Sequence, residues 1–436
     1  MAVTEKQLHN GGASSVLYTD RRDFYVDPQV TKELWTDVAP FTTLISNQET
    51  RDVPDPIFKM FEHRNPWQKQ EFAINKTSPG TVPNNDTGLG SLPIDGIVGL
   101  PSSADSSYVG LQVEVWNSAK TTKKGTAVIS AVASNGEITL KSTKGATIVL
   151  ADNDVAIVIG NARGEGSSAP DAWSDELSVV WNSCQIFKTP LQVTGTLEAA
   201  VLRGESSELA RLRRQKAQEH KIQKEKAFLF GTRVGGVGLS GSSDSFADDG
   251  RTDSDGNKIR STYGIIPAIE DYGASSGDDQ NIFAVAESSY TYANFVDDME
   301  KVFQYVPESG SKRCFVGAGA LGYWSKLSTG NTMADKSGWT VNIGDMKRDA
   351  LGFNYRTLET PHGMLQMIPT PSLRGPYNKY MLVVSDDNLF HAQYRPMVYQ
   401  ANIKTDNAFD GVKDQYMSDE GVGIQLIESH KLFKIS

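Results

Sequence analysis

Short runs of β-branched residues alternate with turn formers between residues 106 and 160. Spacing of about ten residues between such runs is typical of a small antiparallel barrel or sandwich. Asn135-Gly136 is the strongest hairpin signal among them, because both residues tolerate the left-handed backbone of a tight turn. The predicted strands are Gln112–Trp116, Thr126–Val132, Glu137–Leu140 and Val155–Ile159. We therefore expect a small all-β insertion at residues 106–160.

The longest helical pattern of the chain runs from about Thr196 to Phe230, with Thr196 as N-cap and Gly231 as the stop. A helix of that length would be roughly 50 Å long. Leu202, Leu209 and Leu212 share one face, but the next large apolar residue is Ile222. Only one narrow side of this helix can therefore be buried.

Strands and helices mix without a strict βαβ alternation in the second half of the chain, which predicts an α+β fold. The pattern over Tyr292–Tyr305 is amphipathic and predicts a helix, and Leu321–Leu327 predicts a shorter one. Strands are expected at Lys312–Val316, Phe353–Leu358, Met364–Ile368 and Tyr380–Val384. Residues 1–56 are expected to form an extended arm, and residues 75–104, rich in Gly, Pro, Ser, Thr and Asn, a long loop.

Composition narrows the class of protein. The 436 residues include 39% hydrophobic and 22% charged positions, which excludes a wholly disordered chain. The net charge of −10 makes the surface as a whole repel nucleic acid and anionic lipid, so any DNA contact must be local. Nothing in the sequence approaches a membrane span or signal peptide, and Cys184 and Cys314 are too few for a disulfide scaffold. We expect a soluble protein that is made in a cytoplasm.

The long helix is locally basic in this acidic chain. Between positions 203 and 226 eight basic residues oppose four glutamates, a local charge of +8 − 4 = +4. One interpretation is a solvated face with local pairs such as Glu208 to Arg211. The other is a side that faces a polyanion or an acidic partner. The basic residues are Arg203, Arg211, Arg213, Arg214, Lys216, Lys221, Lys224 and Lys226, and Gly204 is the candidate point of flexure.

Gly317-Ala-Gly319-Ala-Leu-Gly322 matches the dinucleotide-binding pattern G-x-G-x-x-G between a predicted strand and a predicted helix. No acidic residue closes a second strand about 20 residues later, as that motif requires. We interpret the segment as a tight turn whose glycines adopt positive φ. A dinucleotide-binding oxidoreductase that uses this turn remains the alternative.

The other motifs favour no catalytic, cofactor or metal site. Asp253-Ser-Asp255-Gly-Asn257 lacks the glycine and the bidentate glutamate of a calcium loop, although a weak cation site within residues 249–257 stays open. Gly273-Ala-Ser275-Ser-Gly277 matches a nucleophile elbow but has no apolar strand before it. None of the six histidines stands in a zinc-binding spacing.

Several segments, in this order, resemble the SU10-type family of tailed-bacteriophage major capsid proteins, which have the HK97-like fold. The resemblance covers about residues 14 to 432. The segments are Leu34-Trp-Thr-Asp-Val-Ala-Pro-Phe-Thr-Thr-Leu44, Phe61-Glu-His-Arg64, Val158-Ile-Gly-Asn-Ala162, Gln185-Ile-Phe-Lys-Thr-Pro190, Glu219 through Gly231, and Gln400-Ala-Asn402 through Gly411-Val-Lys-Asp-Gln415.

This resemblance implies a division into the parts of that fold: an N-terminal arm at 1–56, an E-loop region at 57–185 with the β-insertion at 106–160, a P-domain at 186–285 built on a spine helix at about 196–230, an A-domain at 286–399, and a return to the P-domain at 400–436. It also implies a structural protein, not an enzyme. Hexamers and pentamers would close an icosahedral shell around double-stranded DNA.

The implied partners are a scaffolding protein, here a separate one, a portal protein, a possible decoration protein and DNA bound without sequence specificity, with no membrane involved. The protein would reside in the virion and assemble in the host cytoplasm. A third reading is a virion decoration or tail protein that uses the β-insertion to bind a surface.

Overall fold

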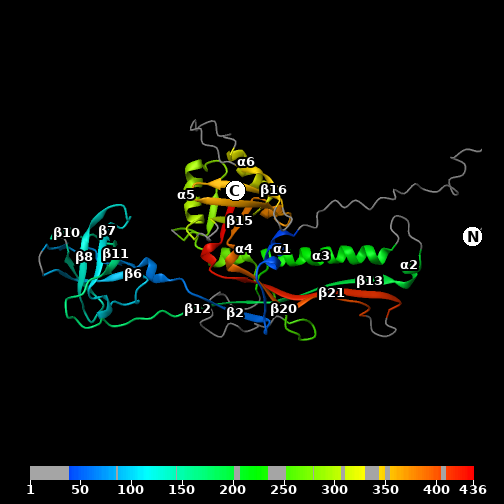
Figure 1. Cartoon of the computed structure of the whole chain (residues 1–436), viewed down its shortest axis with the longest axis horizontal. Coiled ribbons are helices and arrows are strands. Elements are labelled where there is room, and N and C mark those ends of the chain that lie inside the picture. Colours follow the sequence, from blue (N-terminus) through cyan, green and yellow to red (C-terminus); the bar gives the residue numbers. More distant parts are fainter. Residues whose placement is uncertain are drawn as a thin grey trace, which may run out of the picture. The chain divides into compact units, whose positions relative to one another are not determined.

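The computed structural model divides the chain into two compact units (Figure 1). One unit is Phe61–Ser178, and the other comprises the residues before and after it. The structure describes residues 39–84, 87–143, 145–200, 207–233, 252–277, 279–305, 310–328, 343–348, 354–403 and 409–436. In these residues no helix is both long and apolar enough to cross a membrane.

The unit Phe61–Ser178 is a small β-barrel. Its seven strands have the order β5-β9-β8-β7-β11-β3-β6, and the two outermost strands are separated along the chain by Pro93 alone. Because consecutive strands joined by one residue cannot lie at opposite edges of a flat sheet, the sheet curls until its edges meet. The strands are β3 (Glu71–Ile74), β5 (Leu89–Leu92), β6 (Ile94–Val98), β7 (Leu111–Trp116), β8 (Lys123–Val132), β9 (Ile138–Ser142) and β11 (Asp154–Asn161), with a separate pair formed by β4 (Thr81–Val82) and β10 (Ile148–Val149).

Alternating apolar residues fill the barrel, among them Phe72, Val113, Ile129 and Leu140. The predicted hairpin is confirmed: β8 and β9 pair across the Asn135-Gly136 turn, where Gly136 has φ 81°. The barrel is larger than the insertion predicted at 106–160. Strands β3, β5 and β6 come from residues before it, where turn-forming residues hid the short strands from sequence analysis.

The second unit contains a seven-stranded mixed sheet of order β14-β22-β19-β15-β18-β17-β16. Adjacent residues on its strands point to opposite faces, so that Cys314 and Val316 enter one core and Phe315 enters another. The strands are β14 (Ile282–Val285), β15 (Ser311–Val316), β16 (Ile343–Arg348), β17 (Asn354–Thr360), β18 (Gly363–Pro369), β19 (Tyr380–Val384) and β22 (Lys431–Ile435).

Helices cover both faces of that sheet. α5 (Tyr292–Val302) and α6 (Ala318–Ser328) supply Phe295, Met299 and Trp324 to one core. α1 (Pro40–Asn47), α4 (Ile265–Tyr272) and the end of α3 (Glu208–Phe230) pack on the other face. Strand β22 joins this sheet although residues 400–436 were expected to return to the P-domain, because its run of buried residues, Lys431–Phe433 and Ile435, fits a strand covered on both sides.

A four-stranded sheet of order β1-β20-β21-β13 lies under α3. Its strands are β1 (Thr50–Asp52), β13 (Gln185–Thr194), β20 (Leu389–Gln400) and β21 (Gly411–Ile424), and a further pair joins β2 (Ile57–Glu62) to β12 (Ser178–Ser183). Along β13 residues alternate strictly between buried and exposed, which shows that one face is covered and the other open. Single 3-10 turns lie at Pro66–Lys69, Ser106–Tyr108, Gly375–Tyr377, Asp386–Asn388 and Ile427–Ser429.

The prediction of one continuous helix over about 196–230 is wrong at its N-terminal end. α2 (Gly195–Ala199) is capped by Thr194, and at its end Ala200 is extended with ψ 138°. α3 then starts afresh, because the side chain of Ser207 accepts a hydrogen bond from the Ala210 N–H at 3.3 Å. Gly231 ends it as predicted. Gly204 and Arg203 lie outside the described residues.

Candidate functional site

The long helix α3 packs on β21 through a row of polar contacts. Alternate residues of a strand share one face, and residues three or four apart share one side of a helix. From Arg213 to Lys224 the helix advances about 17 Å, and from Asp414 to Glu420 the strand advances about 20 Å. The two repeats therefore stay nearly in step and bring Arg213 to Asp414, His220 to Ser418, and Lys224 to Glu420. We call these three contacts the polar ladder.

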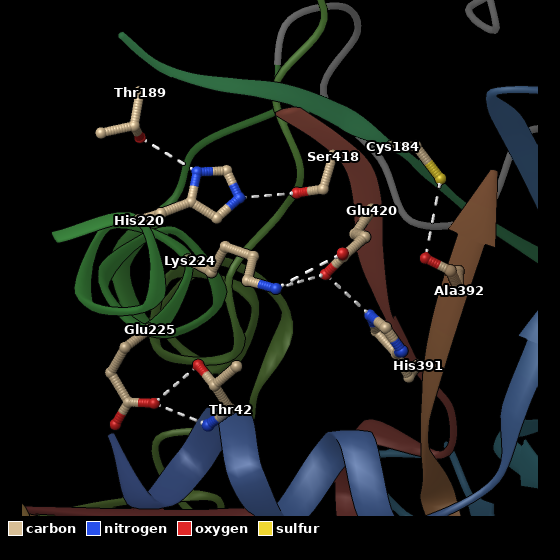
Figure 2. A network of polar contacts seen from close by, with 10 residues as sticks. All are labelled: Thr42, Cys184, Thr189, His220, Lys224, Glu225, His391, Ala392, Ser418 and Glu420. Carbon is tan, nitrogen blue, oxygen red and sulfur yellow. Dashed lines mark hydrogen bonds and ion pairs between the residues drawn. The ribbon is translucent and has the colours of Figure 1, made fainter. Parts of the chain in front are cut away.

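The innermost contact of the ladder is an ion pair that a histidine joins (Figure 2). Lys224 Nζ donates to both carboxylate oxygens of Glu420, at 3.3 and 3.1 Å, and His391 Nε2 lies 3.1 Å from Oε2. All three residues are buried. Burial raises the pKa of Glu420, but the hydrogen bond from His391 and the charge of Lys224 outweigh it and leave the pKa lowered. Glu420 is thus a buried carboxylate held ionised by its two partners.

His220 occupies the middle of the ladder, between two hydroxyl groups. Its Nδ1 lies 3.0 Å from Thr189 Oγ1 on β13, and its Nε2 lies 3.0 Å from Ser418 Oγ on β21 (Figure 2). Burial, aided by the charge of Lys224, lowers the pKa of His220 to about 4. The imidazole is therefore neutral at pH 7 and ties α3 to two strands at once.

The outermost contact joins Arg213 to Asp414. The guanidinium donates to Oδ2 through Nε at 3.0 Å and through Nη2 at 2.8 Å, and it lies over the Tyr399 ring. The Tyr399 hydroxyl also donates to Asp414. Burial raises the pKa of Asp414, yet the donors at Asn402, Tyr399 and Arg213 outweigh it and lower the pKa overall.

Glu225 connects α3 to the start of α1. Its carboxylate accepts hydrogen bonds from the Phe41 N–H at 3.2 Å, the Thr42 N–H at 2.6 Å and the Thr42 hydroxyl at 2.8 Å. No side chain of α1 itself caps this end. Because the first N–H groups of a helix have no partner inside it, Glu225 serves as a cap supplied from 183 residues further along the chain. Burial raises the pKa of Glu225 against the opposing effect of these donors.

The structure distributes the predicted basic residues around α3 and does not gather them on one side. Arg213 and Lys224 face the sheet. Arg211 pairs with Glu208, as its spacing predicted, and Lys216 pairs with Glu219 at 2.7 Å. The exposed side of the helix retains Arg214 and Lys221, and Lys226 is exposed on a different side.

Sequence reasoning missed the acidic half of this site. Asp414, Ser418 and Glu420 stand at even spacing in β21, and Glu225 lies only four residues after Lys221. Even spacing of polar residues in a strand usually marks a solvated face, so it gave no reason to place these side chains inward. The inward spacing of Arg213, His220 and Lys224 was the one available signal, and their charge argued against burial.

The glycine-rich turn has a different physical basis from the one predicted. It does join β15 to α6, but Gly317, Gly319 and Gly322 do not have positive φ. A Cβ on Gly317 would lie 2.3 Å from the Asn378 carbonyl oxygen, so close approach requires the glycine. The Gly319 N–H donates to Asn378 Oδ1 at 3.0 Å, and the Ala320 N–H donates to Asn378 O at 3.1 Å. Asn378 thus takes the donors that would hold a phosphate in a dinucleotide site.

The remaining motifs have local explanations. Asp253 accepts hydrogen bonds from the N–H groups of Asp255 and Asn257, which closes a turn, and residues 249–251 of the predicted cation site lie outside the described part. Gly273 ends α4, so no strand precedes the elbow-like sequence. Cys184 and Cys314 are both buried. Among the described residues, no group of three or more His, Cys, Asp or Glu is placed to hold a metal ion.

Comparison with known proteins gives a consistent picture. Residues 28–417 match the family described as SU10 major capsid protein. The major capsid protein of Pseudomonas phage PaMx41 is 27% identical over 158 residues, which are 36% of this chain and 33% of that protein. The match therefore spans about a third of the length of that relative.

Solved structures with similar backbones are also capsid proteins by their titles. The capsid of a native GTA particle has a TM-score of 0.47 at 9% identity, with 97% of this chain and 99% of that chain covered. Mycobacterium phage Bobi has a TM-score of 0.44 at 8% identity, with 97% and 98% covered. Since both scores are under 0.5, the assignment of a family depends on the family match over residues 28–417.

Proposed function

The chain belongs to the SU10 major capsid protein family, and from this we propose that it is the major shell subunit of a tailed double-stranded DNA bacteriophage. Hexamers and pentamers of the subunit would close an icosahedral shell around the genome. The observation that carries this proposal is the family match over residues 28–417, which extends on both sides of the barrel.

We further propose the HK97-like division of the chain. The N-terminal arm is 1–56, the E-loop region is 57–185 and carries the barrel, and α3 is the spine of a P-domain at 186–285 and 400–436. The A-domain is 286–399. The seven-stranded sheet supports one adjustment, because β14 and β22 join it from either side of that range. The A-domain and the adjoining P-domain segments therefore share one core.

In this function the protein is structural and performs no catalysis. The Gly317 turn supports that reading against the oxidoreductase alternative, because its N–H groups already bind Asn378. Assembly would proceed with a separate scaffolding protein and a portal protein in the host cytoplasm, and the mature subunit would reside in the virion. A decoration protein is a further possible partner, and packaged DNA would be contacted without sequence specificity.

The proposal is tested by sedimentation of the purified protein, expressed with and without its neighbouring genes, followed by electron microscopy of the fastest fraction. Closed, uniform particles of megadalton mass are expected. A monomer or dimer under every condition, including with candidate scaffolds, would contradict the proposal. Assembly only on the surface of another shell would indicate a decoration protein instead.

A further inference from the structure

One segment of the chain is extended, acidic and wholly exposed. Every residue from 161 to 177 is exposed. Its part from Gly164 to Leu177, which we call the acidic segment, has four carboxylates and no lysine or arginine. Trp173 is 42% exposed and Leu177 is 52% exposed. An ordered path with a tryptophan and so little burial is typical of a surface that is covered in a complex.

Few contacts hold this segment to its own chain. The Ser106 hydroxyl donates to Asp171, and His63 Nε2 lies 3.0 Å from Asp175. Both contacts join exposed groups, so they leave most of the negative charge and the indole facing solvent. The segment is thus presented in an extended form and not packed away.

The exposed side of α3 has the opposite charge. Arg214 and Lys221 are seven residues apart, which places them on the same side of the helix about 10 Å apart. Glu208 and Glu219 lie more than about 100° around the helix from this side. Glu225 is four residues from Lys221, but it is buried and bound to Thr42. We call Arg214 and Lys221 the basic side of α3.

We propose that the basic side of α3 receives the acidic segment of a second copy of this chain. The inference rests on the proposed function, in which copies contact one another many times. The two charge patterns match in length, since Asp171 and Asp175 are at most about 13 Å apart in an extended chain. Trp173 lies between these carboxylates and provides an apolar anchor, the residue type that most often dominates an interface. Charge pairs at the rim then set the register and the choice of partner.

A charge-swap experiment tests this contact. The full chain is expressed as Arg214→Glu/Lys221→Glu, as Asp171→Lys/Glu176→Lys, and as the combination of all four changes. Each double variant is expected to lower the yield of closed particles by at least about tenfold, and the combination to restore it to within about threefold of the unchanged chain. Because the restored variant contains every substitution, misfolding cannot explain the loss. Normal particles from both double variants, or no restoration in the combination, would overturn the proposal.

Two matched controls carry the same charge changes elsewhere. Lys226→Glu alters an exposed lysine on another side of α3, and Asp152→Lys alters an exposed acid in a turn of the barrel. Both are expected to assemble within about twofold of the unchanged chain. Losses equal to those of the double variants would show a general charge effect and contradict a specific contact.

A binding measurement separates this inference from the proposed function. A labelled peptide of residues 161–177 is titrated with the unassembled full chain and followed by fluorescence anisotropy. Arg214→Glu/Lys221→Glu is expected to weaken binding by at least about tenfold and Lys226→Glu by less than about twofold. Peptide binding without particles would sink the shell function and leave the contact standing. If short duplex DNA binds this side and the peptide does not, the occupant is nucleic acid and the proposal is wrong.

Discussion

Two helix-to-sheet contacts in the same unit are built from opposite materials. α5 and α6 cover one face of the seven-stranded sheet with Phe295, Met299 and Trp324, and nearly every side chain between these layers is apolar. α3 covers the four-stranded sheet through the polar ladder, and only its last turns add apolar residues such as Phe228. The first contact gains stability from burial in proportion to area, and the second gains it only where charges and donors meet.

The difference teaches what each contact controls. An apolar layer tolerates exchange of side chains of similar volume and small shifts of register. In the polar ladder a shift by one residue would leave Lys224 and Glu420 buried without partners, at a cost of several kcal/mol. We infer that the ladder contributes little net stability but holds α3 at one position along β21.

The largest expected effect comes from breaking the ladder at its most buried pair. Glu420→Ala leaves the Lys224 ammonium without its carboxylate and is expected to lower the free energy of unfolding by about 3–5 kcal/mol. Urea titration of the unassembled subunit, followed by circular dichroism, measures it. The control is Glu287→Ala, which removes an exposed pair with Lys379 and should cost less than about 1 kcal/mol. Equal losses in the two variants would show that burial does not matter here.

A buried lysine makes the seven-stranded sheet sensitive to alkaline pH. Lys312 is 2% exposed, and burial, with the charge of Lys431, lowers its pKa to about 7. The unfolded chain, with a pKa near 10.5, binds more protons between these values, so stability rises from pH 7 to pH 10 by roughly 2–4 kcal/mol. Lys312→Met should flatten this rise in urea titrations at each pH. The same rise in the variant would exclude Lys312 as the source.

His220 makes the polar ladder sensitive to acid. Its folded pKa of about 4 lies below the usual 6.5, so the unfolded state takes up a proton first as the pH falls. Stability is complete above pH 6.5 and is lost between there and pH 4, by up to about 3 kcal/mol. His220→Gln should reduce the slope of stability against pH, measured by thermal melting, although buried His430, whose pKa of about 3 is also lowered, contributes a slope of its own. An unchanged slope would contradict this assignment.

Removing the cap on α1 should have a smaller and more local effect. Glu225→Gln retains an acceptor but loses the charge at the helix N-terminus, at an expected cost of about 1–2 kcal/mol. Hydrogen exchange should show faster opening of residues 40–47 and unchanged protection of the barrel. Thr42→Val, which removes only the hydroxyl partner, should cost less than Glu225→Gln. Equal protection of α1 in all three proteins would show that the cap has no role.

The smallest expected change provides the sharpest test of the comparison. Lys224→Met/Glu420→Leu replaces the buried pair by apolar groups, and its free energy of unfolding should lie within about 1 kcal/mol of that of the unchanged chain. If the ladder sets the position of α3, this variant should be as stable as before but form fewer uniform particles in electron microscopy. Uniform particles at the usual yield would show that the position of α3 does not depend on this pair.

Elements with a clear repeat were predictable. The amphipathic pattern of Phe295 and Met299 located α5, and the Asn135-Gly136 signal located the β8–β9 hairpin. The start of α3 was not predictable from apolar spacing, because Ser207 ends one pattern and caps another. Of the site residues, the basic ones on α3 were found, but their division between the sheet and solvent was not.

The sequence by itself determined the class of protein, the type of most elements and the family, because composition, local periodicity and the order of short motifs are properties of neighbouring residues. Only the tertiary structure decided that Lys224 and Glu225 turn inward, and that Asn378 fills the glycine turn. Their partners lie tens to hundreds of residues away along the chain. A charged side chain is stable inside a protein only when such a partner is in place, and no local pattern records where that partner will be.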